Sequence, residues 1–481
     1  MKIAFIVPPS LDTKPPAERI FGCNYGIYPQ PNIFILYPAT IVKNAGYNVS
    51  FLDFALGKTK AGDFREFFKS HKYDICVFYT VFLSKKNDLK ARSILTEGNS
   101  DGKFIFLSTE PTANPQDFVS ENSIVIRGEP ESRILAVIEA LEKNDFSHIP
   151  GISYMEDGRI RHNASAHVIE DLDILPFPDR TLLDRERYYN PKLSAVPFTT
   201  MIASRGCSFK CYYCIPNSLD FSREIEFKRE HKESKPPVRL RSAQNVIKEF
   251  RMLARAGYKA VSFLDDQFVW GDKRTVEICE GIRDCNIQWS CLARADMLQN
   301  EAVVSSMAQA GCRNISLGIE SFNQDILDYI GKGCKVELFY SAVRNLKKHG
   351  IEAVLNILLG ASPLETVDTI EHTFRQVLLL DPDYVLFSVC TPFPYTKFNE
   401  IARKEGWMVK PEYEAIDPVM QAFISYPHLK KNDLEKIIKR LYLRYYFRPA
   451  YLVKKIQGIR TMGDLRNKLL AGRKILGFKS S

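Results

Sequence analysis

The sequence of 481 residues contains no uninterrupted hydrophobic run of the roughly 18 residues that a membrane-spanning helix needs. The first nine residues include one short apolar run, which Pro8 and Pro9 end, and this run is too short for a secretory signal peptide. We therefore expect a cytoplasmic protein that is either soluble or attached to a membrane only at its surface.

The sequence also lacks the cysteine pattern of a secreted protein. Its eleven cysteines are odd in number and scattered, which argues against a disulfide framework and for a reducing compartment. Outside one short segment, no two cysteines stand two or three residues apart. The sequence therefore predicts a single cysteine-based site.

Charge is distributed unevenly along the chain. Residues 429–481 carry 15 Lys and Arg against 3 Asp and Glu, a net charge of +12, whereas the whole chain has a net charge of +9. The basic character therefore belongs to the C-terminal region, and the rest of the chain is slightly acidic.

The single cysteine-rich segment reads Cys207-Ser-Phe-Lys-Cys211-Tyr-Tyr-Cys214. Three thiolates on one short loop suit an iron–sulfur cluster, and a [4Fe–4S] cluster held by three ligands leaves one iron open for chemistry. Zinc is a weaker interpretation, because structural zinc sites close with a fourth ligand and no histidine follows at such a spacing. Three ordinary buried thiols remain the third alternative.

Apolar runs alternate with helical patterns along residues 1–145. Such runs are typical of strands buried on both faces of a parallel sheet, so this region predicts a doubly wound, Rossmann-like α/β domain with ligands at the carboxyl ends of its strands. The expected strands are residues 2–7, 49–53, 75–79, 104–107 and 124–126, and the expected helices include 38–45 and 131–141.

Residues 146–195 are rich in proline and turn signals, which predicts a surface connector containing a hairpin-like turn at Glu156-Asp-Gly-Arg. Residues 196–410 show a second alternation with six expected strands, and residues 411–481 read as basic helices. Six strand–helix units fit a partial TIM-type barrel, with its functional groups on the loops after the strands. The six strands are expected at residues 198–204, 260–264, 287–292, 314–319, 353–359 and 384–389.

The spacing of Cys207, Cys211 and Cys214 resembles that of radical S-adenosylmethionine (SAM) enzymes. The resemblance implies a partial barrel in which the open iron of a [4Fe–4S] cluster binds SAM, whose reductive cleavage yields a 5′-deoxyadenosyl radical. It also implies that Tyr213 makes a backbone contact to the adenine of SAM.

Further segments after the expected strands resemble the SAM-binding loops of this family. The resemblance implies that Asp265 and Asp266 bind the amino group of SAM, that Arg294 lies near its carboxylate, and that Glu320 of Gly318-Ile-Glu320-Ser321 meets SAM or a neighbouring cofactor. Simpler alternatives stay open: the aspartates as a helix N-cap, and Arg294 as an ion pair with Asp296. The turns at residues 360–366 and 391–396 also match, although Leu364 and Tyr395 replace the usual glycines.

The N-terminal domain resembles the cobalamin-binding domain of one large radical SAM branch. The matching segments are Val7-Pro8-Pro9, Pro38-Ala-Thr, Gly46-Tyr47, Leu52-Asp53, Arg127-Gly-Glu129-Pro-Glu131 and, in the connector, Ile174-Leu-Pro-Phe-Pro-Asp-Arg. The cobalamin contacts that this implies are Pro8, Tyr79, Ser108, Thr109, Gly128 and Glu129. The D-x-H-x-x-G motif is absent, so no histidine is expected to ligate the cobalt from below.

Ser108 and Thr109 stand where the relatives usually have two glycines that let the corrin approach the backbone. A degenerate domain that is kept only as a scaffold is therefore an alternative to a cobalamin-binding one.

Together these features predict a cobalamin-dependent radical SAM enzyme that methylates an unactivated carbon of a small or lipid-like substrate. The alternatives are a cobalamin-dependent cyclase or ring-remodelling enzyme, and a non-catalytic iron–sulfur scaffold or electron-transfer protein. The chemistry needs an external electron donor of the flavodoxin or ferredoxin type. For the basic region, packing on the barrel, contact with an anionic membrane and contact with RNA stay open, and nucleic acid is the least expected because no RNA-binding fold signature is present.

Overall fold

The computed structural model describes residues 1–12, 16–22, 28–57, 59–143, 145–232, 234–409 and 421–457. The described residues form two compact units. The first unit comprises residues 1–208 and 215–291, and the second comprises residues 209–214, 292–409 and 421–457.

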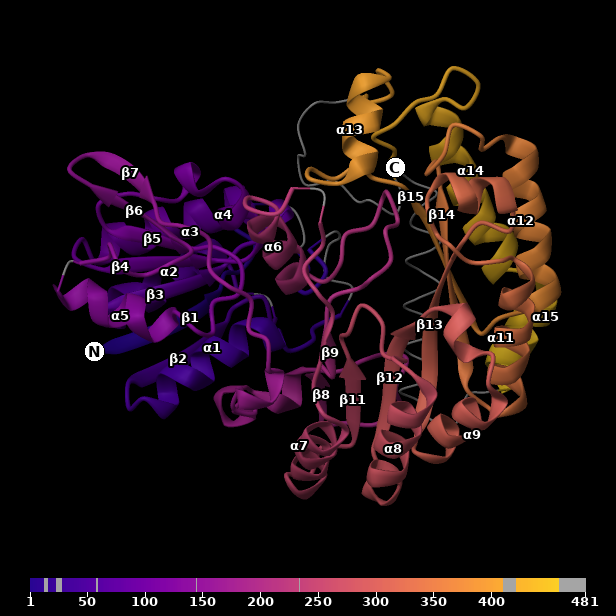
Figure 1. Cartoon of the computed structure of the whole chain (residues 1–481), viewed down its shortest axis with the longest axis horizontal. Helices are drawn as coiled ribbons and strands as arrows, with labels where there is room; N and C mark the ends of the chain where they lie inside the picture. Colours follow the sequence, from indigo (N-terminus) through magenta and orange to yellow (C-terminus); the bar gives the residue numbers. More distant parts are fainter. Residues whose placement is uncertain are drawn as a thin grey trace. The chain divides into compact units, whose positions relative to one another are not determined.

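The N-terminal part of the first unit is a seven-stranded sheet in the order β2-β1-β3-β4-β5-β6-β7, drawn in indigo to purple in Figure 1. Strands β1 to β5 run parallel, as predicted, and each expected strand is present within a few residues of its expected bounds. The strands are β1 (Lys2–Val7), β2 (Asn48–Asp53), β3 (Ile75–Tyr79), β4 (Lys103–Leu107) and β5 (Ser123–Ile126), and the helices are α1 (Ile33–Asn44), α2 (Ala61–Ser70), α3 (Lys85–Gly98), α4 (Thr109–Ala113) and α5 (Ile134–Lys143).

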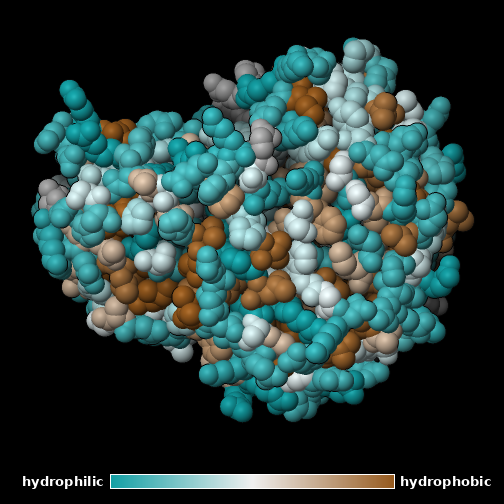
Figure 2. Space-filling view, viewed as in Figure 1, coloured by the Kyte–Doolittle hydropathy of each residue, from teal (hydrophilic) through white to brown (hydrophobic). Residues whose placement is uncertain are grey.

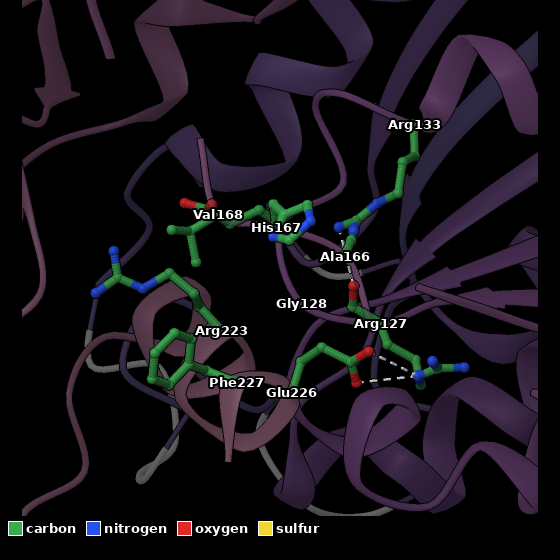
Figure 3. Close-up of a pocket in the computed structure, with 10 residues that line it drawn as sticks. Arg127, Gly128, Arg133, Ala166, His167, Val168, Arg223, Glu226 and Phe227 are labelled. Carbon is green, nitrogen blue, oxygen red and sulfur yellow. Dashed lines mark hydrogen bonds and ion pairs between the residues drawn. The ribbon is translucent and has the colours of Figure 1, made fainter. Parts of the chain in front are cut away.

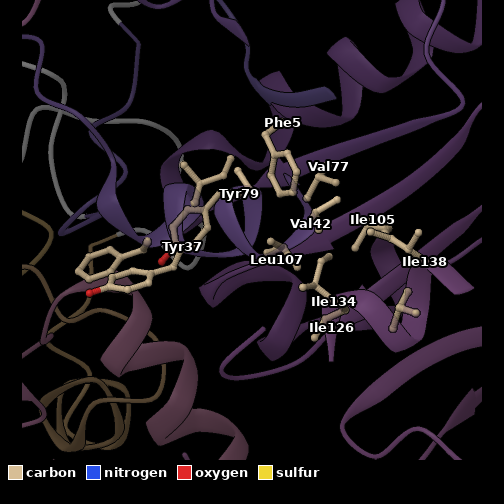
Figure 4. Close-up of a cluster of buried hydrophobic side chains, with 14 of the residues drawn as sticks. Phe5, Tyr37, Val42, Val77, Tyr79, Ile105, Leu107, Ile126, Ile134 and Ile138 are labelled. Atoms are coloured by element: carbon tan, nitrogen blue, oxygen red, sulfur yellow. The ribbon is translucent and has the colours of Figure 1, made fainter. Parts of the chain in front are cut away.

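Alternate residues of each strand feed two separate cores, one on each face of the sheet. Phe5 of β1 packs in a cluster with side chains of α1 and α5 (Figure 4), whereas its neighbours Ala4 and Ile6 pack in a cluster with α2 and α3. Successive side chains of a strand point to opposite faces, so a continuous apolar run fills both cores at once. This arrangement confirms the doubly wound architecture.

The connector contributes more structure than its composition predicted. Its hairpin of β6 (Ile152–Glu156) and β7 (Arg159–His162) adds two antiparallel strands to the edge of the N-terminal sheet. Ile152 and Tyr154 are buried against that sheet. The prediction of a hairpin at this place was right, but the hairpin is part of the sheet and not a surface linker.

Six further parallel strands follow in the expected order. In the first unit β11 pairs with β8 and with β12, and in the second unit β14 pairs with β13 and with β15. The strands are β8 (Phe198–Met201), β11 (Ala260–Phe263), β12 (Gln288–Ala293), β13 (Cys312–Glu320), β14 (Glu352–Leu359) and β15 (Tyr384–Val389). The helices are α6 (Ser218–Phe227), α7 (Ala243–Arg255), α8 (Asp272–Ile282), α9 (Glu301–Gln309), α10 (Gln324–Tyr329), α11 (Glu337–Lys348), α12 (Val367–Leu380) and α13 (Lys397–Lys404), and a short antiparallel pair joins β9 (Ser204–Arg205) to β10 (Arg239–Leu240).

The described part of the basic region forms α14 (Lys431–Tyr446) and α15 (Pro449–Gln457). The Tyr442 hydroxyl accepts the Phe387 N–H at 3.1 Å and donates to the Phe387 carbonyl at 2.9 Å, and Tyr446 makes the same pair with Val385 at 3.0 and 2.7 Å. The tyrosines of α14 therefore satisfy the backbone edge of β15, which is a packing role.

Among the described residues, no helix is both long and apolar enough to cross a membrane. Hydrophilic residues predominate on the face of the molecule drawn in Figure 2.

Candidate functional site

The three predicted cluster ligands lie on the loop that follows β9, within eight residues of one another in the sequence. Each is half-buried and outside any disulfide bond, and the Cys214 N–H donates to the Cys211 carbonyl at 3.3 Å. Cys207 belongs to the first unit, whereas Cys211 and Cys214 belong to the second. Across the described residues, no three cysteine, histidine or acidic side chains are gathered closely enough to hold a metal ion. The donor chemistry of this loop fits the cluster, but the structure does not close the three thiols into a ligand set.

Arg294 follows β12 and uses its donors within the second unit. Its Nε and Nη2 donate to the Asp296 carboxylate at 3.0 and 2.9 Å, while Nη1 reaches the Lys332 carbonyl at 2.9 Å and Nη2 the Gly333 carbonyl at 3.1 Å. The guanidinium carbon also lies 3.5 Å from the ring centre of Phe209 on the cluster loop. Arg294 thus ties the cluster loop to the loop after α10, and a contact with the SAM carboxylate stays a prediction.

The structure brings together two of the predicted site residues, Tyr213 and Glu320. The Tyr213 phenol forms a hydrogen bond with the Glu320 carboxylate, and burial together with this negative charge raises the pKa of Tyr213 well above its usual range. Oε1 of Glu320 also lies 3.1 Å from Nζ of Lys332, and both side chains of this ion pair are buried. Glu320 is therefore fixed from two sides at the carboxyl end of β13.

The glycine of the Gly318-Ile-Glu320-Ser321 segment has a steric reason. A Cβ atom at Gly318 would lie 2.6 Å from Oε1 of Glu320 and 2.7 Å from Nζ of Lys332, so any side chain there would displace the ion pair. Glu320 itself has a φ of +64° beside a bulge in the pairing of β13 with β14. Strained backbone of this kind persists only where the surrounding structure holds it, and it is typical of functional sites.

Asp265 lies at the carboxyl end of β11 and supports the start of the cluster loop. Its carboxylate accepts the Ala203 N–H at 3.0 Å and the Ser204 hydroxyl, and the side chain is fully buried. Burial raises the pKa of Asp265 to about 6 despite these hydrogen bonds. In this structure Asp265 therefore positions backbone, and a contact with the amino group of SAM stays a prediction.

Asp266 faces a second buried acid. Its Oδ1 accepts the Asn217 N–H at 2.7 Å, and Nδ2 of Asn217 bridges to Asp220 at 2.8 Å and to Asp266 at 3.2 Å. Burial and the nearby Asp220 raise the pKa of Asp266 well above its usual range. A cation would relieve this unfavourable pairing of acids, which suits the predicted role toward an ammonium group.

Of the turns after β14 and β15, only the second has a glycine-like backbone at the residue that replaces the usual glycine. Glu365 is buried and accepts the Gly360 N–H, and burial raises its pKa to about 8. Tyr395 has a φ of +66°, the left-handed region that favours glycine, so the chain adopts the glycine conformation with a tyrosine in place.

The six residues predicted to contact cobalamin are all buried, and most lie near α6. The Tyr79 hydroxyl lies 2.9 Å from Oγ of Ser218, and the Ser222 hydroxyl donates to the Gly128 carbonyl at 3.3 Å. A Cβ atom at Gly128 would lie 3.3 Å from Cβ of Glu226. Helix α6 therefore covers the carboxyl ends of β3 and β5. The six residues are Pro8, Tyr79, Ser108, Thr109, Gly128 and Glu129.

Ser108 and Thr109 behave as replaced glycines would. Ser108 has a φ of +86°, so the backbone after β4 keeps the conformation of a glycine although a serine occupies it. The buried Thr109 hydroxyl has no hydrogen-bond partner in the described structure. An unpartnered buried hydroxyl at a strand end is a group that a polar ligand would satisfy.

Glu129 has a different environment from the other five. Its carboxylate receives Nη1 of Arg205 at 2.8 Å, Nη2 of Arg239 at 2.6 Å and the Ile169 N–H at 2.9 Å. These arginines hold the pKa of Glu129 well below its usual range. Glu129 is therefore a junction between β5, the connector and the strand pair β9–β10.

A small hollow lies beside Gly128, between the connector and the C-terminal end of α6 (Figure 3). Arg127 closes one side through its ion pair with Glu226 at 3.0 Å, and Arg133 and Arg223 contribute buried guanidinium nitrogens without partners. Unpartnered buried polar atoms therefore lie along this hollow, as they also do elsewhere in the described residues.

A family model described as "Radical SAM superfamily" matches residues 201–377. The "Uncharacterized methyltransferase PH0819" of Pyrococcus horikoshii is 29% identical over 467 residues, which cover 95% of each chain. The "Anaerobic magnesium-protoporphyrin IX monomethyl ester cyclase" of Rubrivivax gelatinosus is 26% identical over 439 residues, 88% of this chain and 75% of that one. The solved structure of the cobalamin-dependent SAM radical enzyme OxsB, with aqua-cobalamin and SAM bound, aligns with a TM-score of 0.72 at 16% identity, over 98% of this chain and 70% of that one.

Residues 201–377 therefore form a radical SAM domain, and the protein is an enzyme. Its relatives are named as a methyltransferase and a cyclase, and its fold is that of the cobalamin-dependent SAM radical enzyme OxsB, an α/β fold with parallel sheets. The predicted fold class is confirmed, and the predicted [4Fe–4S] cluster, SAM and cobalamin are the cofactors that solved structures of this fold contain.

Two features of the site were not predicted from the sequence. Lys332, the buried partner of Glu320, lies in a glycine-flanked loop outside every motif. Helix α6 mixes four apolar residues with six polar or charged ones, and its charged residues gave no reason to expect burial along nearly its whole length. Asn217, the N-cap of α6, follows Cys214 by three residues in the sequence. This short separation was the one signal that could have placed α6 near the site.

Proposed function

We propose that the protein is a cobalamin-dependent radical SAM methyltransferase that methylates an unactivated carbon of a small or lipid-like substrate. The observation that carries the proposal is the match, over 95% of both chains, to a protein named a methyltransferase. The buried Tyr213, Glu320 and Lys332 beside the cluster loop support it, because they form a prepared polar site at the carboxyl end of a barrel strand.

The residues of the chain fit the cluster and SAM in kind. Cys207, Cys211 and Cys214 would hold the cluster, and Asp266 would receive the amino group of SAM, since a cation there relieves the repulsion from Asp220. Glu320 would accept hydrogen bonds from SAM with the carboxylate already oriented by Lys332. When bound, the cluster and SAM supply radical chemistry, and cobalamin supplies the methyl group.

The face predicted to bind cobalamin offers suitable polar groups, but helix α6 covers it. Thr109 and the glycine-like backbone at Ser108 offer polar groups and close backbone approach at the strand ends. Because α6 lies on Tyr79 and Gly128, a corrin would reach this face only after α6 moved away. Water or ligand could replace the hydrogen bonds of Ser218 and Ser222 to the sheet, whereas Leu219 packs in the apolar core of the N-terminal domain.

Anaerobic reconstitution followed by mass spectrometry tests the proposal. With SAM, a strong reductant and cobalamin, the protein should form 5′-deoxyadenosine and S-adenosylhomocysteine, and omission of cobalamin should suppress the second product. Formation of 5′-deoxyadenosine alone, with and without cobalamin, would exclude methyl transfer from SAM.

A second candidate is a cobalamin-dependent cyclase or ring-remodelling enzyme, which the Rubrivivax relative favours. The two candidates differ in the product, because a methyltransferase adds 14 mass units to its substrate and a cyclase does not. Both need an external one-electron donor, for which we propose a flavodoxin or a ferredoxin.

We further propose a cytoplasmic location with peripheral contact to an anionic membrane through the basic C-terminal region. The support is α15, where Leu452, Val453 and Ile456 are exposed beside Lys454 and Lys455. Exposed apolar groups among cations suit a lipid surface. The aromatic residues of α14 do not contribute, because Tyr442 and Tyr445 are buried.

A further inference from the structure

Lys332 is a buried cation that the proposed function uses only to orient Glu320. Its side chain is 7% exposed, and its Nζ lies 3.1 Å from Oε1 of Glu320. Removing an ammonium from water costs several kcal/mol, and an ion pair only partly offsets that cost. A buried Lys–Glu pair is therefore weak evidence for stability, and a functional role would explain better why Lys332 is buried.

The loop that carries Lys332 lies against the cluster loop. The Tyr212 N–H donates to the Ile330 carbonyl at 2.9 Å, and a Cβ atom at Gly331 would lie 3.1 Å from the Lys210 carbonyl oxygen. These contacts flank Cys211 on both sides in the sequence. Against the opposing effect of burial, Glu320 and then Cys211 raise the pKa of Lys332, and the backbone contacts hold its loop beside the cluster loop.

The position of Lys332 is fixed by its neighbours. Arg294 donates to the carbonyls of Lys332 and Gly333, and the Lys332 N–H donates to the Leu327 carbonyl at 2.9 Å. The ammonium cannot swing into solvent without breaking the Glu320 pair. A fixed charge in a buried site acts through a lower effective dielectric than a surface lysine does.

Reduction of a [4Fe–4S] cluster adds one electron, supplied here by the external donor, and makes the cluster more negative by one charge. A nearby fixed cation stabilises the reduced form more than the oxidised form, so it raises the reduction potential. We propose that Lys332 is a positioning residue that tunes the cluster: its ammonium, held by Glu320, favours the reduced state that cleaves SAM. This inference rests on the proposed function only in requiring the cluster.

The test is an EPR-monitored redox titration of the full-length, reconstituted protein without SAM, with iron and sulfide counted for each variant. In Lys332→Met, the ratio of reduced to oxidised cluster at a given potential should fall about tenfold, which for one electron is about 59 mV. Lys332→Arg should stay within about threefold of the wild type. Lys348→Met, which removes an exposed lysine of the same unit, should have no effect.

The variant Lys332→Met also leaves Glu320 as an unpaired carboxylate, which by itself would lower the potential. The double variant Glu320→Gln/Lys332→Met removes both charges and isolates the effect of the ammonium. In this double variant, the ratio of reduced to oxidised cluster at a given potential should still fall about threefold below that of the wild type. A double variant that titrates like the wild type, or more easily, would overturn the inference.

Should Lys332→Met fail to hold the cluster, Lys332→Gln replaces it, because the amide keeps a hydrogen bond to Glu320 without the charge. An unchanged ratio in Lys332→Gln would equally overturn the inference. If the wild type cleaves SAM while these variants titrate normally, only the tuning role fails. If the variants shift but the wild type forms no SAM products, only the proposed function fails.

Discussion

The hydroxyl of Tyr79, at the end of β3, lies 2.9 Å from Oγ of Ser218, the first residue of α6. This contact joins the predicted cobalamin face to a helix that begins four residues after the last cluster cysteine. The helix lies where the open-sheet rule places a ligand, outside the carboxyl ends of parallel strands. Helix α6 thus follows the cluster loop in the sequence and lies on the predicted cobalamin face.

Cobalamin binding should therefore loosen α6. In hydrogen-exchange mass spectrometry, peptides covering residues 218–227 should lose protection when hydroxocobalamin binds, whereas peptides of α12 should not change. The variant Ser218→Ala/Ser222→Ala removes hydrogen bonds to Tyr79, Thr112 and Gly128, so it should bind cobalamin faster. If cobalamin binds stoichiometrically while hydrogen exchange in α6 does not change, α6 does not cover the cobalamin face.

Replacing Tyr442 by Phe should destabilise the second unit by about 1–2 kcal/mol, because the change keeps the ring but leaves the Phe387 N–H and carbonyl without a partner. Thermal unfolding measures the loss. Tyr189→Phe, at an exposed position, is the control and should unfold like the wild type. Equal melting temperatures for both variants would show that α14 does not stabilise the β15 edge through its hydroxyls.

Glu365 should make the stability of the protein fall as pH rises. Burial raises its folded pKa to about 8, whereas the unfolded chain releases the proton near the usual value of 4.5, so stability declines between these two pH values and then levels off. Glu365→Gln stays neutral and should gain a few kcal/mol relative to the wild type between pH 5 and pH 8.

The control for this pH series is Glu371→Gln. Hydrogen bonding to Arg444 lowers the pKa of Glu371, so this variant should lose stability above about pH 4.5, the opposite sign. Melting temperatures measured at several pH values compare the two. If the melting temperatures of Glu365→Gln and the wild type differ by the same amount at every pH, Glu365 is not a buried acid with a raised pKa.

Membrane contact through the basic region should depend on salt. Each cation near an anionic surface contributes at most about 1 kcal/mol, so attachment should be reversible and lost at high salt. Liposome flotation should show binding to anionic and not to neutral vesicles, and Leu452→Ser/Ile456→Ser should weaken it. No flotation with anionic vesicles at low salt would leave only the packing role of α14.

The strands could be predicted from the sequence because each is a compact apolar run with a turn on either side. Lys2–Val7, Ile75–Tyr79 and Tyr384–Val389 match their expected bounds, because each is dominated by apolar and aromatic residues, with polar residues only at Lys2 and Ser388. The hairpin of the connector was only half predicted. Its strands are short and β7 is largely exposed, so their membership of the sheet depends on contacts with β5 that no local pattern records.

The sequence predicted where the site residues lie at the strand ends, but not which residues they bind. Glu320 and Tyr213 were assigned to the same site and do meet, because the carboxyl ends of neighbouring strands share one edge. Arg294 and Asp265 follow the strands after which they were expected. In the structure, however, their side chains form hydrogen bonds with other residues of the chain. Partners such as Lys332 are fixed by tertiary packing, which sequence spacing does not encode.

The cluster is the premise of every other assignment. Changing Cys207, Cys211 or Cys214 to Ala should abolish iron binding and SAM cleavage together, because three thiolates are the minimum set for this cluster. Cys76→Ala and Cys390→Ala, at buried positions away from the loop, should keep both activities.

The most direct measurement of the central claim is SAM cleavage by the anaerobically reconstituted wild type and by the triple variant Cys207→Ala/Cys211→Ala/Cys214→Ala. The wild type should hold about four iron and four sulfide per chain and release 5′-deoxyadenosine under a strong reductant, and the triple variant should do neither. Release of 5′-deoxyadenosine by the triple variant, or none by the fully loaded wild type, would contradict the account.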